Sequence, residues 1–181
     1  MRATNTATEY GWVTRVLHWL MALLILGMIA LGAFMGDVPK TDSSRLVLFT
    51  LHMSTGVVLL VLILLRSGWH LYTKPPKEAE NLWPWEHRLA WVIQRLMYLC
   101  MLLVPIAGYL MVSSAGHKIP FYGLLQLPEA LPKVGWVHEF FEGAHSFLAY
   151  SLLVLVIVHV AGAIKHRYID GNDVVERIKL W

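Results

Sequence analysis

Histidines inside apolar sequence are the residues of this chain best suited to chemistry. Nine histidines occur among 181 residues, and four of them, His18, His52, His145 and His159, fall within long apolar runs. An ionisable side chain in such a run is costly and indicates function by default. One of these histidines alone could equally be a core residue bonded to a backbone carbonyl, but four together favour a cofactor site.

The spacing of the last two of these histidines predicts two sites rather than one. His145 and His159 are 14 residues apart, which is close to four full turns of an α-helix. Both rings would then project from one face of the same helix, about 21 Å apart along its axis. One helix would thus contribute a ligand at each of two depths.

The remaining two histidines match those depths, His18 with His159 and His52 with His145. An iron porphyrin fits between two imidazole rings, and histidine is a common axial haem ligand. Helix bundles build cofactor sites from side chains on facing helices. The sequence therefore predicts two haem b groups, with these four histidines as axial ligands of the iron.

Small and basic residues near the predicted ligands have two readings each. Gly56 and Gly162 share helix faces with His52 and His159, so they leave room for a flat macrocycle or reflect ordinary close helix packing. Three arginines could pair with haem propionates or extend to the membrane edge: Arg15, Arg45 and Arg95.

Four apolar runs must position these histidines. They cover residues 16–35, 46–65, 96–112 and 144–164, and about 20 apolar residues suffice to cross a bilayer. We predict an all-α membrane protein, a four-helix transmembrane bundle with helices at approximately 14–35, 46–69, 89–112 and 140–165. Residues 1–181 would form a single domain. Pro105 lies within the third run and predicts a kink there.

The composition agrees with a membrane protein and excludes several other classes. Hydrophobic residues make up 57% of the chain and charged residues only 15%, against about 25% charged in soluble domains. No basic run with interleaved aromatic residues is present, so nucleic-acid binding is set aside. The single cysteine, Cys100, excludes an intramolecular disulfide and an iron–sulfur cluster held by this chain alone.

The distribution of basic residues predicts the orientation. Eleven of the 15 lysines and arginines fall on the side of the two termini and four on the other side. Cytoplasmic loops are richer in basic residues, so both termini and the loop 73–85 are predicted to be cytoplasmic. The loops 36–45 and 113–137 would lie outside, and residues 124–131 would form a short amphipathic piece against the membrane.

With these histidines in place, the sequence resembles the bacterial cytochrome b561 family over nearly its whole length. The residues that support the resemblance are Tyr10-Gly11, Leu17-His18-Trp19-Leu20, Leu51-His52-Met53-Ser54-Thr55-Gly56, Arg66, Lys74-Pro75-Pro76, Pro105-Ile106-Ala107-Gly108-Tyr109, His145, His159 and Lys165-His166-Arg167-Tyr168-Ile169-Asp170.

This resemblance implies a di-haem protein of the bacterial inner membrane that exchanges electrons with quinone. It further implies a superoxide:ubiquinone oxidoreductase, in which superoxide is oxidised to dioxygen and ubiquinone accepts the electron. The four buried histidines match the family's haem ligands one by one. The outer loop 113–137 is longer than in the best-studied branch, so substrate-entry residues cannot be transferred to it by motif.

Two classes of function follow. In an enzyme, a cationic surface near the outer haem would concentrate superoxide, unless its members are simply solvated loop residues. The candidates are Arg45, Lys118 and Lys133, with His117 and His138 beside them. Alternatively, the chain is a haem-bearing membrane anchor that links a periplasmic redox partner, such as a hydrogenase or formate dehydrogenase, to the quinone pool.

A third class, a histidine-lined metal transporter, fares poorly. A transport site near the middle of the membrane would need clustered ligands or carboxylates. No aspartate or glutamate lies in any of the four apolar cores.

Overall fold

The computed structural model describes residues 2–77 and 83–180, most of which belong to long helices. In these residues α1 covers Trp12–Asp37, α2 Ser44–Tyr72, α3 Pro84–Ser114 and α4 Gly135–Tyr168. All four helices are long and apolar enough to cross a membrane. The predicted all-α fold of four membrane-spanning helices is thereby confirmed.

Each helix extends beyond the predicted bounds because polar residues continue it past the apolar core. At the start of α3, Pro84 occupies the first turn, where its missing N–H costs nothing. Glu86 Oε2 accepts a hydrogen bond of 3.0 Å from the backbone N–H of Trp83. The helix then continues through Pro105 to Ser114. The predicted cytoplasmic loop 73–85 is correspondingly shorter, and its residues 78–82 lie outside the described part of the chain.

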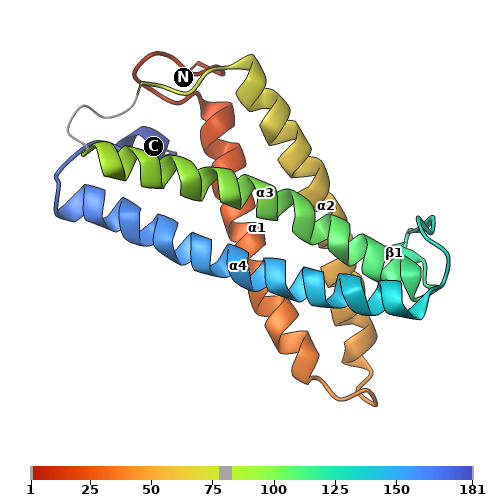
Figure 1. Ribbon diagram of the computed structural model, residues 1–181. Coiled ribbons are helices and arrows are strands. Elements are labelled where there is room, and N and C mark those ends of the chain that lie inside the picture. The colour runs from red at the N-terminus through yellow and green to blue at the C-terminus, as the bar shows by residue number, and fades with distance from the viewer. Residues whose placement is uncertain (1, 78–82, 181) are drawn as a thin grey trace.

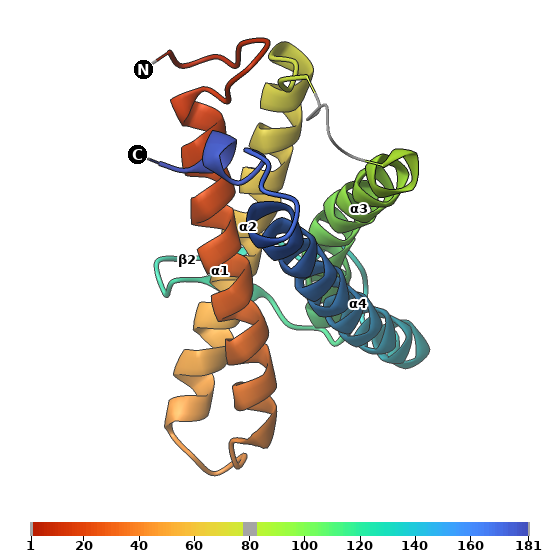
Figure 2. The ribbon, with the colours of Figure 1, turned by 90° about the vertical axis from the view of Figure 1, so that its left-hand side faces the viewer.

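The helices form two antiparallel pairs that cross each other obliquely (Figures 1 and 2). α1 packs along α2, α3 packs along α4, and α2 also contacts α3. Over the described residues, α4 has extended backbone contact with α3 alone. It therefore meets α1 and α2 through side chains rather than through close backbone packing.

A cluster of buried apolar side chains lies between the two predicted histidine levels. Its members come from all four helices: Met21, Ile25, Leu59, Ile63, Cys100, Met101 and Leu152. Leu152 is the midpoint of α4 between His145 and His159, seven residues from each. The bundle thus has an apolar layer between one histidine level and the other.

Both ends of the described chain gather at one end of the bundle (Figure 1). The C-terminal segment folds back on α1, where Trp19 Nε1 donates to the carbonyl of Ile178 at 2.9 Å. Arg15 Nη1 donates to the carbonyl of Lys179 at 3.0 Å. The backbone N–H of Lys77, beyond α2, donates to the carbonyl of Ala7 at 3.0 Å. The two termini therefore share one side, and its cytoplasmic location stays a prediction.

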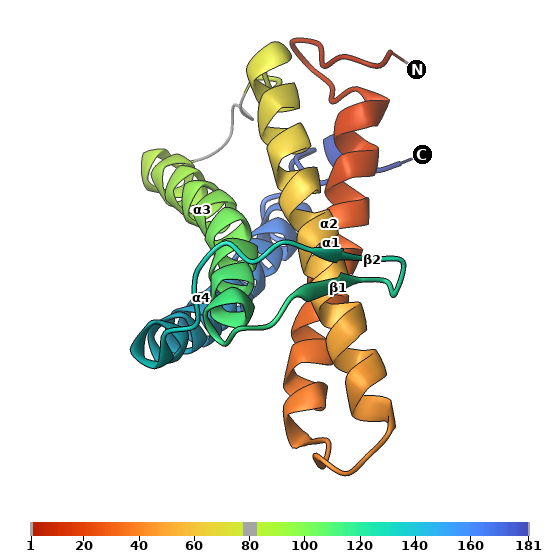
Figure 3. The same cartoon turned by 90° about the vertical axis from the view of Figure 1, so that its right-hand side faces the viewer.

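The loop between α3 and α4 contains a β-hairpin in place of the predicted amphipathic piece. β1 (Ile119–Phe121) pairs antiparallel with β2 (Leu125–Leu127). Tyr122 and Gly123 link the strands with positive φ angles of 49° and 73°, the backbone of a turn that favours glycine and suits a hairpin. Figure 3 shows the hairpin lying across the α1–α2 pair.

Buried hydroxyl groups fasten this loop to two helices. Ser54 of α2 is fully buried, and its Oγ lies 2.8 Å from the Pro120 carbonyl and accepts the Tyr122 N–H at 2.8 Å. Ser113 Oγ of α3 accepts the backbone N–H groups of Ala130 and Leu131 at 2.7 and 2.8 Å. The loop is therefore a strap whose own backbone groups are satisfied by the helices beneath it.

Candidate functional site

The four buried histidines come together as two ring pairs. The centroids of the His18 and His159 rings are 6.4 Å apart, with 62° between the ring planes. Those of His52 and His145 are 6.1 Å apart, with 75° between the planes. We call these the inner pair and the outer pair. The partners are those expected from helix depth, whereas the role of the rings as iron ligands stays a prediction.

Glycines on neighbouring helices back both rings of the outer pair. A Cβ placed on Gly108 of α3 would lie 3.0 Å from His145 Nδ1, and one placed on Gly32 of α1 would lie 3.2 Å from His52 Cε1. His145 Nδ1 reaches the Val104 carbonyl of α3 at 2.9 Å. Gly108 lies one turn after Val104, so its missing side chain allows the ring to approach that carbonyl.

The inner pair has a charged neighbour instead. Arg66 Nη2 of α2 lies 3.3 Å from His18 Nδ1, and Arg66 Nε donates to the Tyr98 hydroxyl of α3 at 2.9 Å. Arginine has hydrogen-bond donors but no acceptor. The two pairs therefore differ in what faces their ring nitrogens, a cation at the inner pair and a carbonyl at the outer pair.

The glycines and arginines expected near the haem levels occupy other surroundings. A Cβ on Gly56 would meet only Met28, and one on Gly162 would meet nothing within 4 Å. Arg15 is bonded to backbone carbonyls of Tyr10 and Lys179. Arg45 donates to the Val38 carbonyl and stacks over Phe49, while Arg95 stacks over Trp91. None of these arginines has a contact with a paired histidine among the described residues.

The residues proposed to attract superoxide are only partly brought together. Lys118 is exposed in the loop just before β1, and the aliphatic chain of the exposed Lys133 packs beside Gly116, next to His117. His138 Nδ1 is engaged by the Met111 carbonyl at 3.0 Å. Arg45 belongs to the first turn of α2, at the far tip of the α1–α2 pair and apart from the α3–α4 connection (Figure 1).

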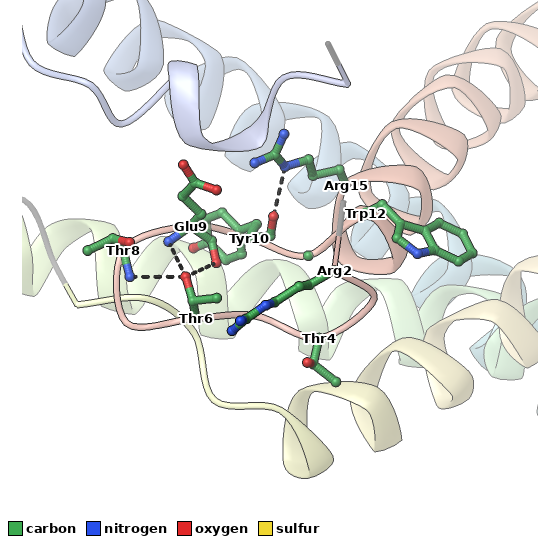
Figure 4. A pocket seen from close by; sticks show the side chains of 9 residues that line it. Arg2, Thr4, Thr6, Thr8, Glu9, Tyr10, Trp12 and Arg15 are labelled. Atoms are coloured by element: carbon green, nitrogen blue, oxygen red, sulfur yellow. Dashed lines mark hydrogen bonds between the residues drawn. The ribbon is translucent and has the colours of Figure 1, made fainter.

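A cavity of about 570 Å³ lies in the N-terminal segment and contains none of the paired histidines. Figure 4 shows its lining residues, which include Arg2, Glu9, Tyr10 and Arg15. Thr6 Oγ1 accepts the Glu9 N–H at 3.0 Å, and Arg15 Nε donates to the Tyr10 carbonyl at 2.9 Å. Burial raises the pKa of the Tyr10 hydroxyl. These contacts stabilise the turn that leads into α1.

Together, the fold and the ring pairs define a four-helix membrane protein with two histidine pairs stacked along the bundle. The sequence matches the profile of prokaryotic cytochrome b561 over residues 9–179. It is 31% identical to cytochrome b561 homolog 2 of Escherichia coli strain K12 over 178 residues, 98% of this chain and 95% of that protein. It is 24% identical to cytochrome b561 homolog 1 of the same strain over 167 residues, 90% and 92% of the two chains.

This chain belongs to the prokaryotic cytochrome b561 family. It is accordingly a multi-pass bacterial membrane protein that binds haem b and transfers electrons. The residues present fit such a group on one observation of the structure. A bond between a metal and an imidazole nitrogen is about 2 Å long, so rings 6.4 and 6.1 Å apart leave space for one metal between them.

Sequence reasoning did not identify the contacts of Gly32, Val104 and Gly108 with the outer pair or that of Arg66 with the inner pair. Gly108 and Arg66 stand within the residues that support the family resemblance, but no spacing rule connected them with a histidine on another helix. Val104 contributes a backbone carbonyl, which no side-chain pattern can indicate. The transporter interpretation gains no support, since no group of three or more metal-ligating side chains occurs in residues 2–77 and 83–180.

Proposed function

We propose that this chain is a two-haem cytochrome that transfers electrons across the inner membrane, from superoxide on the outer side to ubiquinone. The observation that supports this most directly is the stacking of two histidine pairs along one helix, α4. His18 and His159 would hold one haem and His52 and His145 the other. Each bound haem would supply reversible one-electron chemistry at its iron.

The surroundings of the rings suit that role. The Val104 carbonyl accepts the Nδ1–H of His145, which leaves Nε2 of that ring available as a ligand. The apolar cluster around Leu152 lies between the two levels and separates them with apolar side chains. The protein residues would thereby fix the ligation of the two haems and the spacing between them.

The outer side offers a small basic surface for an anionic substrate. Lys118, Lys133 and His117 belong to the strap between α3 and α4, the helix pair that contains His145. Clustered positive charge raises the local concentration of a small anion and its association rate. Two superoxide anions would give up one electron each and leave as dioxygen. One ubiquinone would take both electrons and two protons to become ubiquinol.

The first test is the dithionite-reduced minus oxidised visible spectrum of the purified chain, with haem quantified per chain. Two b-type haems per chain are expected. A single haem would show that one of the two histidine pairs does not bind haem. Absence of haem would refute the proposal.

The second test separates the enzyme from an electron-transfer subunit. Enzymatically generated superoxide should drive ubiquinone reduction by the isolated chain, and superoxide dismutase should abolish it. If the two-haem protein fails to turn over and instead co-purifies with a periplasmic redox protein, the chain is a membrane anchor for that partner.

A further inference from the structure

The two histidine pairs differ most in the charge beside them. Arg66 Nη2 is 3.3 Å from His18 Nδ1 at the inner pair. A ring that binds iron through Nε2 carries its proton on Nδ1, so Arg66, which can only donate, acts on that ring as a nearby charge and not as a hydrogen-bond partner. The corresponding neighbour at the outer pair is the neutral Val104 carbonyl, 2.9 Å from His145 Nδ1. Because both pairs share α4 and a common apolar core, this is the clearest electrostatic difference between them.

The protein itself supplies no carboxylate partner to Arg66 among the described residues. No carboxylate lies within 4 Å of its guanidinium among residues 2–77 and 83–180. Its neighbours are the Tyr98 hydroxyl, 2.9 Å from Nε, and the Tyr98 ring, 5.6 Å from Cζ. Arg66 as a residue is half-buried and belongs to an apolar helix. A fixed charge in such a medium acts over a longer distance than it would in water.

A cation and a carbonyl have opposite effects on a redox centre held by the adjacent ring. The oxidised iron carries one more positive charge than the reduced iron, so a nearby fixed cation disfavours the oxidised form. A carbonyl that accepts the Nδ1–H of a ligand raises the basicity of that ligand and favours the oxidised form. Hydrogen bonding and charge around axial ligands are established determinants of haem potential.

We propose that the charge on Arg66 makes the haem at the inner pair easier to reduce than the haem at the outer pair. This inference rests on the proposed function, because it assumes a haem at each pair. Electrons that enter at the haem of the outer pair then pass to the haem of the inner pair, where they are more stable. The direction of flow, from the strap side toward the side of the termini, is thereby set by the protein.

The test is a potentiometric titration of the full chain with both haems bound, followed by visible absorbance. In Arg66→Gln, one of the two components should become harder to reduce by at least tenfold in the oxidised-to-reduced ratio, which is 59 mV for one electron. The other component should stay unchanged. Arg66→Lys keeps the charge and should retain most of the wild-type value. Arg95→Gln is the matched control, since Arg95 stacks on Trp91 instead of contacting a paired histidine.

Two further variants identify the component and protect the test against misfolding. A protein with His145→Ala should keep one haem, which should titrate at the higher of the two wild-type potentials. Tyr98→Phe removes the acceptor for Arg66 Nε and should shift the same component in the same direction by a smaller amount. The inference is overturned if two haems remain bound and neither Arg66→Gln nor Tyr98→Phe lowers the potential of a component. A wild-type protein without two haems would instead overturn the proposed function.

Discussion

The inner and outer histidine pairs share one helix but are held by different chemistry. The outer pair rests against glycines and a backbone carbonyl, and the strap that crosses the nearby α1–α2 pair is fastened by neutral hydroxyl groups. The inner pair has Arg66 and Tyr98 beside it, and the helix ends near it are tied by ion pairs such as Lys165 with Glu86 at 2.6 Å. Similar ring geometry therefore occurs in two different surroundings: glycines make room for the rings at the outer pair, and a charged side chain lies beside the inner pair. The two pairs should therefore respond to different substitutions.

The largest effect is expected from removing one ligand. His145→Ala should lower the haem content from two per chain to one, because the inner pair keeps both of its rings. Pyridine haemochrome quantification of the purified protein measures this directly. His117→Ala, in the exposed loop, should keep both haems. Loss of both haems from His145→Ala would show that the two pairs do not bind independently.

A glycine substitution should separate the two pairs almost as clearly. In Gly108→Ala the new Cβ would lie 3.0 Å from His145 Nδ1, so the ring must shift by a few tenths of an ångström where it contacts the Val104 carbonyl. Substitutions that disturb such a supporting contact typically weaken metal binding by on the order of 10–100-fold. Haem content and the outer component of the spectrum should fall together. Gly27→Ala, where a Cβ meets nothing within 4 Å, is the control, and equal loss in both variants would contradict the packing argument.

Charge reversal on the strap tests the outer surface. Replacing Lys118 and Lys133 together by glutamate should slow superoxide-driven reduction by on the order of tenfold at low ionic strength, with the difference shrinking as salt is added. Stopped-flow absorbance of haem reduction gives the rate constant. Lys40→Glu places one such charge reversal on the other outer loop and should have little effect. A salt-independent defect would indicate damage to the strap rather than loss of attraction.

Removing the hydroxyl beneath the strap should cost stability without changing ligation. In Ser54→Ala the N–H of Tyr122 loses its acceptor, and a typical intramolecular hydrogen bond contributes about 0.5–1.5 kcal/mol. Thermal unfolding in detergent and protease cleavage within residues 115–134 should both report the change. Ser151→Ala removes a hydroxyl whose hydrogen-bond partner in the described residues is the Phe147 carbonyl of its own helix. The strap assignment fails if the two variants are equally stable.

The smallest effect is expected on the pH dependence of stability, from Asp170 just after the end of α4. Hydrogen bonds from Lys165 and then His166 lower the pKa of Asp170. A lowered pKa in the folded state stabilises the protein above the unfolded value of about 3.9 and loses that contribution as pH falls below it. Asp170→Asn should therefore reduce stability at neutral pH and flatten its decline below about pH 4. Asp37→Asn, at the exposed outer end of α1, should leave the profile as in the wild type.

Much of the fold could be read from local sequence because lipid imposes simple rules. A bilayer requires helices of a certain length, so the apolar runs predicted all four helices in the described residues. The bounds were less certain, since residues such as Pro84 and Glu86 extend a helix without being apolar. The strap was assigned as an amphipathic piece because its partners, Ser54 and Ser113, are distant in sequence.

Within the site, the sequence by itself determined the four histidines, their two depths and their pairing, because a helix converts residue spacing into direction and height. Only the tertiary structure decided what surrounds the rings. Gly32 and Gly108 matter because they face histidines of other helices, and Arg66 because α2 places it against His18. Contacts between helices depend on crossing and rotation, which the apolar pattern leaves open because lipid accepts any apolar face.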